Sequence, residues 1–231
     1  GWFLRWLDNL QSERSIQGST GYLGMVTPMF PLGTVLFPHM PLDLRIFEQR
    51  YLKLLGDLLE DDTEPEFGVV LIERGQEVGG DDQRFAFGTL ARINQVSANE
   101  QFYFIETVGT QRFKVDAWHG EDPYPQAVIE PLPDLEWDDN LYPSRVHVEK
   151  QVRKLLSFAS EFTELRFPPD TELSEDPLAA AWQMASMLPM GQLDQMDLLQ
   201  SESVEELLSQ TYDLAVAGEE QLQQMIEKDE D

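Results

Sequence analysis

The chain of 231 residues contains no cysteine and only three histidines. The lack of cysteine excludes disulfides, a thiolate nucleophile and any cysteine-ligated metal. The histidines stand apart, and none forms the H-E-x-x-H pair that places two zinc ligands on one face of a helix. His119 with Glu121 and Asp122 comes nearest to a ligand set, and we interpret it as a loop histidine beside solvated acids. We therefore predict no metal site and no cofactor.

Basic residues are scarce. Sixteen Lys and Arg stand against 43 Asp and Glu, which gives a formal net charge of −27. Between Arg166 and Lys228 there is no Lys, Arg or His, although thirteen Asp and Glu occur there. Such a balance repels phosphate backbones and anionic lipid heads, and it favours a solvated acidic face. Nucleic acid and membranes are therefore not expected partners.

Long apolar runs are also missing. No run is long enough to span a bilayer, and no charged n-region, apolar h-region and small-residue cleavage site mark a secretory signal. With no cysteine and no such segment, we predict a cytoplasmic protein.

The common catalytic motifs are absent as well. A phosphate-binding G-x-x-x-x-G-K-[ST] loop needs a glycine directly before a lysine, and no such pair occurs. Ser144, Ser157, Ser160 and Ser186 lack the G-x-S-x-G surroundings of a hydrolase nucleophile. Adjacent carboxylates such as Asp61 and Asp62 carry little information in so acidic a chain. We predict that the chain is not an enzyme, and we name no catalytic residue.

The stretch Pro31–Tyr51 predicts a strand followed by a helix. The apolar run 35–37 is β-prone, and Pro38 and Pro41 end it because each lacks a backbone donor. A helix over 47–60 then follows, since apolar residues recur at helical spacing. Its apolar stripe comprises Phe47, Tyr51, Leu55, Leu58 and Leu59.

Strand patterns continue beyond this helix. A turn at Ser97–Glu100 predicts a hairpin, and Gly109 is predicted to separate two further strands. Six short strands with one helix indicate a small, partly closed barrel over residues 28–133. Besides 35–37, the predicted strands are 67–73, 85–96, 102–108, 112–118 and 126–132.

The spacing of apolar residues changes from a strand pattern to a helix pattern after this region. Residues 134–226 carry helical apolar spacing, with Asp176–Pro177 as one helix start and Ser203–Glu206 as a capping box. Residues 227–231 form an acidic tail. Because strands and helices are segregated along the chain, we predict an α+β fold.

Residues 1–27 form an N-terminal extension. A short apolar stripe at helical spacing is followed by the polar, glycine-containing tract Gln11–Gly24, which is typical of a linker. The segment is either an appendage without a function or a short helix that docks on its own domain or on a neighbouring chain, which leaves a homo-oligomer open. The stripe comprises Trp2, Phe3, Trp6, Leu7 and Leu10.

Several segments resemble the Lon protease N-terminal (substrate-binding) domain. Residues 31–51 contain a proline-leucine start, a VLFP strand, an MPL turn and IFEQRY before the helix. The resemblance covers about residues 28–221, and further matches follow in the order of the family: Phe67–Leu71 (FGVVL), Phe87–Ile93 (FGTLARI), Val108–Val115 (VGTQRFKV) and Tyr124–Ala127 (YPQA).

The resemblance implies a PUA-like β pseudobarrel followed by a C-terminal helical bundle. It also implies binding of unfolded or degron-bearing protein segments, the role of this domain in Lon proteases. Because the chain lacks motifs for the ATPase and serine-lysine peptidase modules, we expect a free-standing, non-catalytic member that acts as an adaptor or holdase.

The apolar residues around the Pro38–Pro41 turn cannot all be covered by ladder neighbours. We predict that some of them line a peptide-binding groove at the barrel mouth, with plain core residues as the alternative. The candidates are Phe37, Met40, Leu42 and Phe47.

Two other functions remain open at this point. One is a small-molecule-binding or hydrolytic pocket at the junction of barrel and helices. The other is RNA binding, which PUA-like barrels often perform and which the net charge of −27 disfavours.

Overall fold

A computed structural model describes residues 26–61, 63–72 and 84–229. The predicted N-terminal stripe and its linker lie outside these residues, as does the glycine- and acid-rich segment 75–82.

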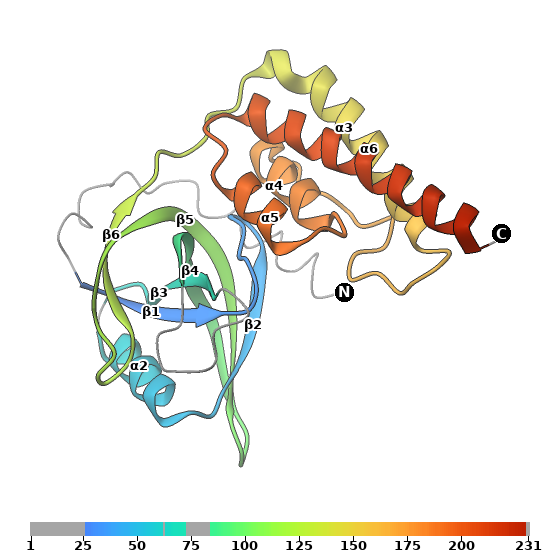
Figure 1. Cartoon of the computed structure of the whole chain (residues 1–231). Coiled ribbons are helices and arrows are strands. Elements are labelled where there is room, and N and C mark those ends of the chain that lie inside the picture. The colour runs from blue at the N-terminus through green and yellow to red at the C-terminus, as the bar shows by residue number, and fades with distance from the viewer. Residues whose placement is uncertain (1–25, 62, 73–83, 230–231) are drawn as a thin grey trace.

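Six strands form one mixed sheet that closes on itself (Figure 1). The strand order is β2-β5-β4-β3-β1-β6, and an additional β5–β6 pairing closes the ring. Strands β1 and β3 are parallel, and the other pairs are antiparallel. This ring of hydrogen bonds is a pseudobarrel, as expected. The strands are β1 (Val26–Leu32), β2 (Pro41–Ile46), β3 (Glu66–Ile72), β4 (Arg84–Ala98), β5 (Tyr103–Gly120) and β6 (Gln126–Pro131).

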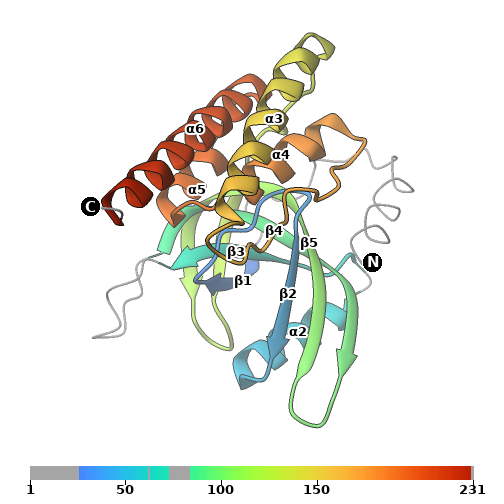
Figure 2. The ribbon, with the colours of Figure 1, turned by 90° about the vertical axis from the view of Figure 1, so that its right-hand side faces the viewer.

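The helices divide into two groups (Figures 1 and 2). Helix α2 (Gln49–Glu60) packs on the barrel through Tyr51, Leu54 and Leu55. The others gather above the opposite end of the barrel, which confirms the α+β segregation. They are the short 3-10 helix η1 (Asp139–Leu141) and helices α3 (Tyr142–Ala159), α4 (Pro177–Met187), α5 (Gln192–Leu199) and α6 (Val204–Asp229).

The predicted helix starts are confirmed by capping contacts. The side chain of Asp176 accepts a hydrogen bond from the Leu178 N–H, and Pro177 is the first residue of α4. At the start of α6, the Ser203 hydroxyl accepts from the Glu206 N–H. The Glu206 carboxylate accepts in return from the Glu202 N–H, one residue before the partner that a standard capping box uses.

The first strand differs from the prediction. Residues 35–37 are not in a strand; the flanking segments β1 and β2 are. The two prolines of β1 explain the error. The Met29 N–H points toward β6 and donates to the Pro125 carbonyl. Because backbone groups alternate along a strand, the nitrogen of Pro28 points toward β3 and that of Pro31 points toward β6. Pairing with β3 begins only at Met29, and pairing with β6 ends at Pro28, so neither missing donor costs a ladder bond.

Strand β5 is continuous where two strands were expected. Gly109 lies inside it, paired with Ala91 of β4. A Cβ atom on Gly109 would lie 2.2 Å from the Phe37 carbonyl oxygen. This glycine therefore permits the close approach of another backbone segment, and it does not end the strand.

One hydrophobic core joins the barrel to the helices. It contains Phe30 and Phe67 of the barrel, Trp182 of α4 and Leu207 of α6. A second, smaller cluster lies within the barrel around Phe113. The barrel and the helical part are therefore packed together as one body.

Candidate functional site

The turn between β1 and β2 is fastened to β5. The His39 N–H donates to the Gly109 carbonyl over 2.8 Å, and the Gly109 N–H donates to the Met40 carbonyl over 2.9 Å. The Thr89 hydroxyl donates to the Leu36 carbonyl over 2.7 Å. His39 has a φ of 62°, a left-handed conformation that is uncommon outside glycine. These contacts hold the turn in one conformation against the barrel.

The four predicted peptide-binding residues occupy different environments. Phe37 and Met40 are 2% and 5% exposed, and the ring of Phe37 lies 6.0 Å from that of Trp182 in α4. Helix α4 therefore covers Phe37, and both side chains belong to the core that joins the barrel to the helices. Leu42 is half-buried in β2, and Phe47, just beyond the end of β2, is 65% exposed. The structure thus leaves Phe47 accessible, keeps Leu42 partly exposed beside the core, and places Phe37 and Met40 in the core.

Strand β2 has one unpaired edge among the described residues, because β5 is its only strand neighbour there. The carbonyls of Met40 and Leu42 both point to β5, where they accept from the Gly109 N–H and the Thr107 hydroxyl. Backbone groups alternate along a strand, so the N–H and C=O groups of Asp43 and Arg45 point away from β5. This edge offers hydrogen-bonding groups to an incoming strand.

An aromatic group lies at the far end of this edge. Ile46 of β2 pairs with Tyr103 of β5, which is 44% exposed, and Phe47 follows directly. The guanidinium of Arg45 lies 5.2 Å from the centre of the Phe102 ring. Exposed aromatic side chains next to an open strand edge can anchor alternate side chains of a bound peptide.

The outer face of β2 is acidic at its centre. Asp43 pairs directly with Glu106 of β5, so two carboxylates stand opposite each other. Burial raises the pKa of the Asp43 carboxyl, and the positive charge of Arg166 opposes that shift. A cationic side chain placed between the two carboxylates would relieve their repulsion.

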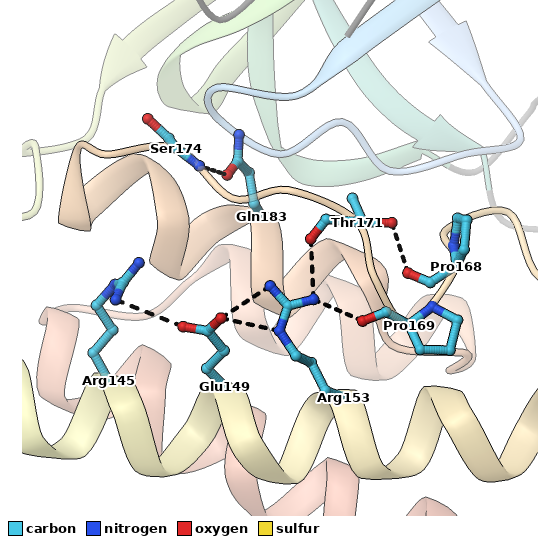
Figure 3. Close-up of polar contacts among 8 residues, drawn as sticks. All are labelled: Arg145, Glu149, Arg153, Pro168, Pro169, Thr171, Ser174 and Gln183. Atoms are coloured by element: carbon cyan, nitrogen blue, oxygen red, sulfur yellow. Dashed lines mark hydrogen bonds and ion pairs between the residues drawn. The ribbon is translucent and has the colours of Figure 1, made fainter. Parts of the chain in front are cut away.

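The connection 160–176 between α3 and α4 passes near the other end of β2 (Figure 2). Arg153 of α3 fixes it, because its guanidinium donates to the carbonyls of Pro169 and Thr171 over 2.7 and 3.0 Å (Figure 3). Glu149 holds that guanidinium over 2.9 Å and also pairs with Arg145. The free edge of β2 is therefore bounded by an anchored segment at one end and by Phe47 at the other.

The junction between the barrel and the helices is filled by a buried arginine. Arg112 of β5 is 5% exposed and donates to the carbonyls of Leu199, Ser201 and Pro133 over 2.7, 2.8 and 3.0 Å. Its guanidinium also lies 5.2 Å from the Trp182 ring. Burial lowers the pKa of Arg112. No role for this residue could be predicted from the sequence, since its partners Leu199 and Ser201 lie far along the chain.

A hollow of about 450 Å³ lies elsewhere, between the starts of α3 and α6. We call it the α3–α6 groove. The two helices run parallel, and the rings of His147 and Tyr212 stack at 4.8 Å. No sequence signal pointed to this groove, because it depends on which helices pair. Its lining residues are Leu141, Pro143, Ser144, His147, Val148, Glu205, Leu208, Ser209 and Tyr212.

Two further properties concern the described residues alone. Within 26–61, 63–72 and 84–229, no three His, Asp or Glu side chains are grouped so that they could hold a metal ion. Over the same ranges, no helix is both long and apolar enough to cross a membrane.

Comparison with known proteins places these features in a family. Residues 26–217 match the model of the ATP-dependent protease La (LON) substrate-binding domain. Lon protease of Brevibacillus choshinensis is 25% identical over 193 residues, which cover 78% of this chain, and that of Koribacter versatilis (strain Ellin345) is 27% identical over 189 residues, which cover 77%. The matched parts span only 23% and 22% of those relatives.

Solved structures agree in fold. A Lon N-terminal domain protein from Xanthomonas campestris matches with a TM-score of 0.56 and 26% identity, over 80% of this chain and 96% of that one. The N-terminal domain of Mycobacterium avium complex Lon protease also gives a TM-score of 0.56, at 15% identity, over 83% of this chain and 98% of that one. The latter likeness concerns the fold alone.

Proposed function

The chain belongs to the family of Lon protease substrate-binding domains, and on that premise we propose that it binds extended apolar segments of other proteins along the free edge of β2. In this role it acts as a non-catalytic adaptor or holdase. The observation that carries the proposal is the unpaired edge itself, at Asp43 and Arg45, flanked by accessible Leu42 and Phe47.

Strand addition explains how such a site recognises many sequences. Backbone hydrogen bonds to the edge supply affinity without regard to side chains, and contacts to alternate side chains supply a preference. From Leu42 to Phe47 the edge is about 17 Å long at roughly 3.4 Å per residue, enough for five or six residues of a bound peptide. Apolar side chains would contact Leu42 and Phe47.

Charge gives the site a further preference. Asp43 and Glu106 face outward together, and the chain carries a net charge of −27. Segments that carry Lys or Arg beside apolar residues are therefore the favoured ligands. Salt should weaken capture of basic peptides more than capture of neutral ones, because it screens exposed charges.

Phe37 and Met40 contribute to this site from behind. Both are buried, Phe37 beside Trp182 of α4, and the turn that carries them leads directly into β2. Their packing fixes the position of the edge, and they do not contact the peptide.

The second function considered above, a small-ligand pocket at the barrel-helix junction, gains no support. Phe37 and Arg112 both lie beside the Trp182 ring in that region, and all three residues are buried. No observation on the described residues favours it over peptide binding.

Fluorescence anisotropy with labelled unfolded peptides tests the proposal. Phe47→Asp should raise Kd about tenfold or more, because burying a Phe side chain contributes roughly 1.5–3 kcal/mol and 1.4 kcal/mol corresponds to tenfold. Leu193→Asp is the matched control, since Leu193 is 68% exposed and lies on α5, outside strands β2 and β5. Equal affinity of the two variants would refute the β2 site.

A further inference from the structure

We propose that the N-terminal stripe of this chain, residues 2–10, docks in the α3–α6 groove of the same molecule. This surface is distinct from the β2 edge, so the inference does not depend on the proposed peptide site. The groove, the direction of the chain at Val26 and the chemistry of the stripe each support it.

The groove is apolar on its floor and aromatic on one wall. Val148 and Leu208 are 3% and 2% exposed, and the stacked rings of His147 and Tyr212 lie across the two helices. Its volume of about 450 Å³ falls within the range of about 300–1,000 Å³ of pockets that enclose small ligands. A groove between two helices of this kind suits an amphipathic helix that inserts large side chains.

Apolar surface extends beside the groove along α3. Tyr142 is 59% exposed and Val146 is 48% exposed, one turn apart on the same helix. Large apolar side chains that gather on a surface are commonly covered by a partner. The helical part of this chain therefore presents an apolar strip with room for additional contacts.

The strand pairing directs the N-terminal chain toward this groove. Strand β1 is antiparallel to β6, with Val26 opposite Val128. Followed backwards from Pro28 to Val26, β1 therefore runs along β6 in the direction of Pro131. From there the connection leads to Leu141 and α3, which form one wall of the groove (Figure 1).

The linker has the length that this path requires. The connection from Pro131 to Leu141 spans at most about 35 Å. The 15 residues between Leu10 and Val26 reach about 50 Å when extended, with an r.m.s. span of about 22 Å for a flexible chain. A tether of this length holds the stripe at a millimolar effective concentration around the groove.

The stripe also matches the groove in chemistry. Trp2 and Trp6 share one helical face, and their rings can stack on the exposed aromatic wall. Arg5 lies between them and Asp8 follows, so the stripe is formally neutral, whereas Glu205 lines the groove and no Lys or Arg does. Arg5 can pair with Glu205, and a neutral stripe is repelled less than an acidic segment would be.

Disulfide trapping in the full chain tests this docking directly, because the sequence contains no cysteine. Asn9→Cys with Ser209→Cys places one thiol beside the stripe and one in the groove. Asn9→Cys with Ser157→Cys is the matched control, because Ser157 is an exposed serine further along α3 and does not line the groove. Under mild oxidation, the groove pair should form an intramolecular disulfide at least tenfold faster than the control pair.

Two accompanying results decide the outcome. Adding Trp2→Ser and Trp6→Ser should reduce the trapping rate to that of the control, which separates docking from random collision of a tether. Equal rates for the groove and control pairs would overturn the proposal. A disulfide-linked dimer as the main product would also overturn it, because the occupant would then be a second copy.

Discussion

Replacing Arg112 by methionine should destabilise the fold more than any other single change to a charged residue at the junction. The guanidinium connects the barrel to the end of α5, since Leu199 is the last residue of that helix and Ser201 follows its C-cap. Cations stabilise helix C-termini by binding the last carbonyl groups. Arg112 thus caps a helix from a strand nearly ninety residues earlier in the chain.

The expected magnitude follows from the groups left behind. Leu199 and Ser201 are each 1% exposed, so two carbonyl groups would lose their charged donor where water has little access. An unsatisfied buried carbonyl group costs about 1–3 kcal/mol, so two of them cost about 2–6 kcal/mol. Methionine retains much of the apolar stem, so we expect Arg112→Met to lower the unfolding free energy by about 3–5 kcal/mol.

Urea denaturation measures this change through the midpoint at a constant m-value. Arg112→Lys should fall between methionine and wild type, because an ammonium keeps the charge but not the fork that reaches three carbonyls. Arg166→Met is the control on an exposed arginine and should change stability by less than about 0.5 kcal/mol. If Arg112→Met stays within about 1 kcal/mol of wild type, the assigned role is wrong.

Further predictions concern the turn before β2, the strand β5 that it contacts, and helix α2. Met40→Asp places a carboxylate in the core and should abolish cooperative unfolding. Met40→Leu should lower the unfolding free energy by less than about 1.5 kcal/mol. A folded Met40→Asp protein would contradict the burial of Met40. Gly109→Ala should be strongly destabilising because the new Cβ would lie 2.2 Å from the Phe37 carbonyl oxygen. Gly56→Ala should stabilise α2 by about 1 kcal/mol, since no atom lies within 4 Å of a Cβ at that position. Thermal melts of the two variants test both predictions. Burial lowers the pKa of His39, and nearby carboxylates oppose this, so the folded protein binds that proton less tightly than the unfolded chain. Stability is then complete above about pH 6.5 and falls as pH decreases toward the lowered pKa. His39→Asn, which tolerates the positive φ, should flatten the dependence between about pH 7 and 5; an unchanged slope would exclude His39 as its source.

The sequence predicted the elements that depend on local patterns. The apolar stripe identified α2, and Asp176–Pro177 identified the start of α4, because spacing and capping are encoded in adjacent residues. The hairpin between β4 and β5 was correctly predicted, although its turn lies at residues 99–102, two residues beyond the predicted Ser97–Glu100. The family resemblance then supplied the closed barrel, which periodicity alone indicated only coarsely.

The errors occurred where a residue acts through a distant neighbour. Pro41 appeared to end a strand, yet it begins β2, and its missing donor falls on the unpaired side of that strand. Gly109 appeared to separate two strands. A glycine is required there because the backbone of Phe37, 72 residues earlier in the chain, approaches it closely, and the local sequence does not show this contact.

The candidate peptide site stays a prediction. From the sequence we selected the segment around Pro38–Pro41, and the structure adds the free edge of β2 beside it. The sequence could not show which apolar residues of this segment are covered, because that depends on how the helices pack on the barrel. Phe37 and Met40 are buried, whereas Leu42 is half-buried and Phe47 is exposed.

Amide hydrogen exchange along β2 tests the central claim, strand addition at the free edge, most directly. In the free protein, the outward N–H groups of Asp43 and Arg45 should exchange faster than that of Leu42, which points to β5. A saturating unfolded peptide that carries Lys or Arg beside apolar residues should slow the exchange of Asp43 and Arg45 at least tenfold and leave Leu42 nearly unchanged. Protection that appears on another surface, with Asp43 and Arg45 unaffected, would contradict the account.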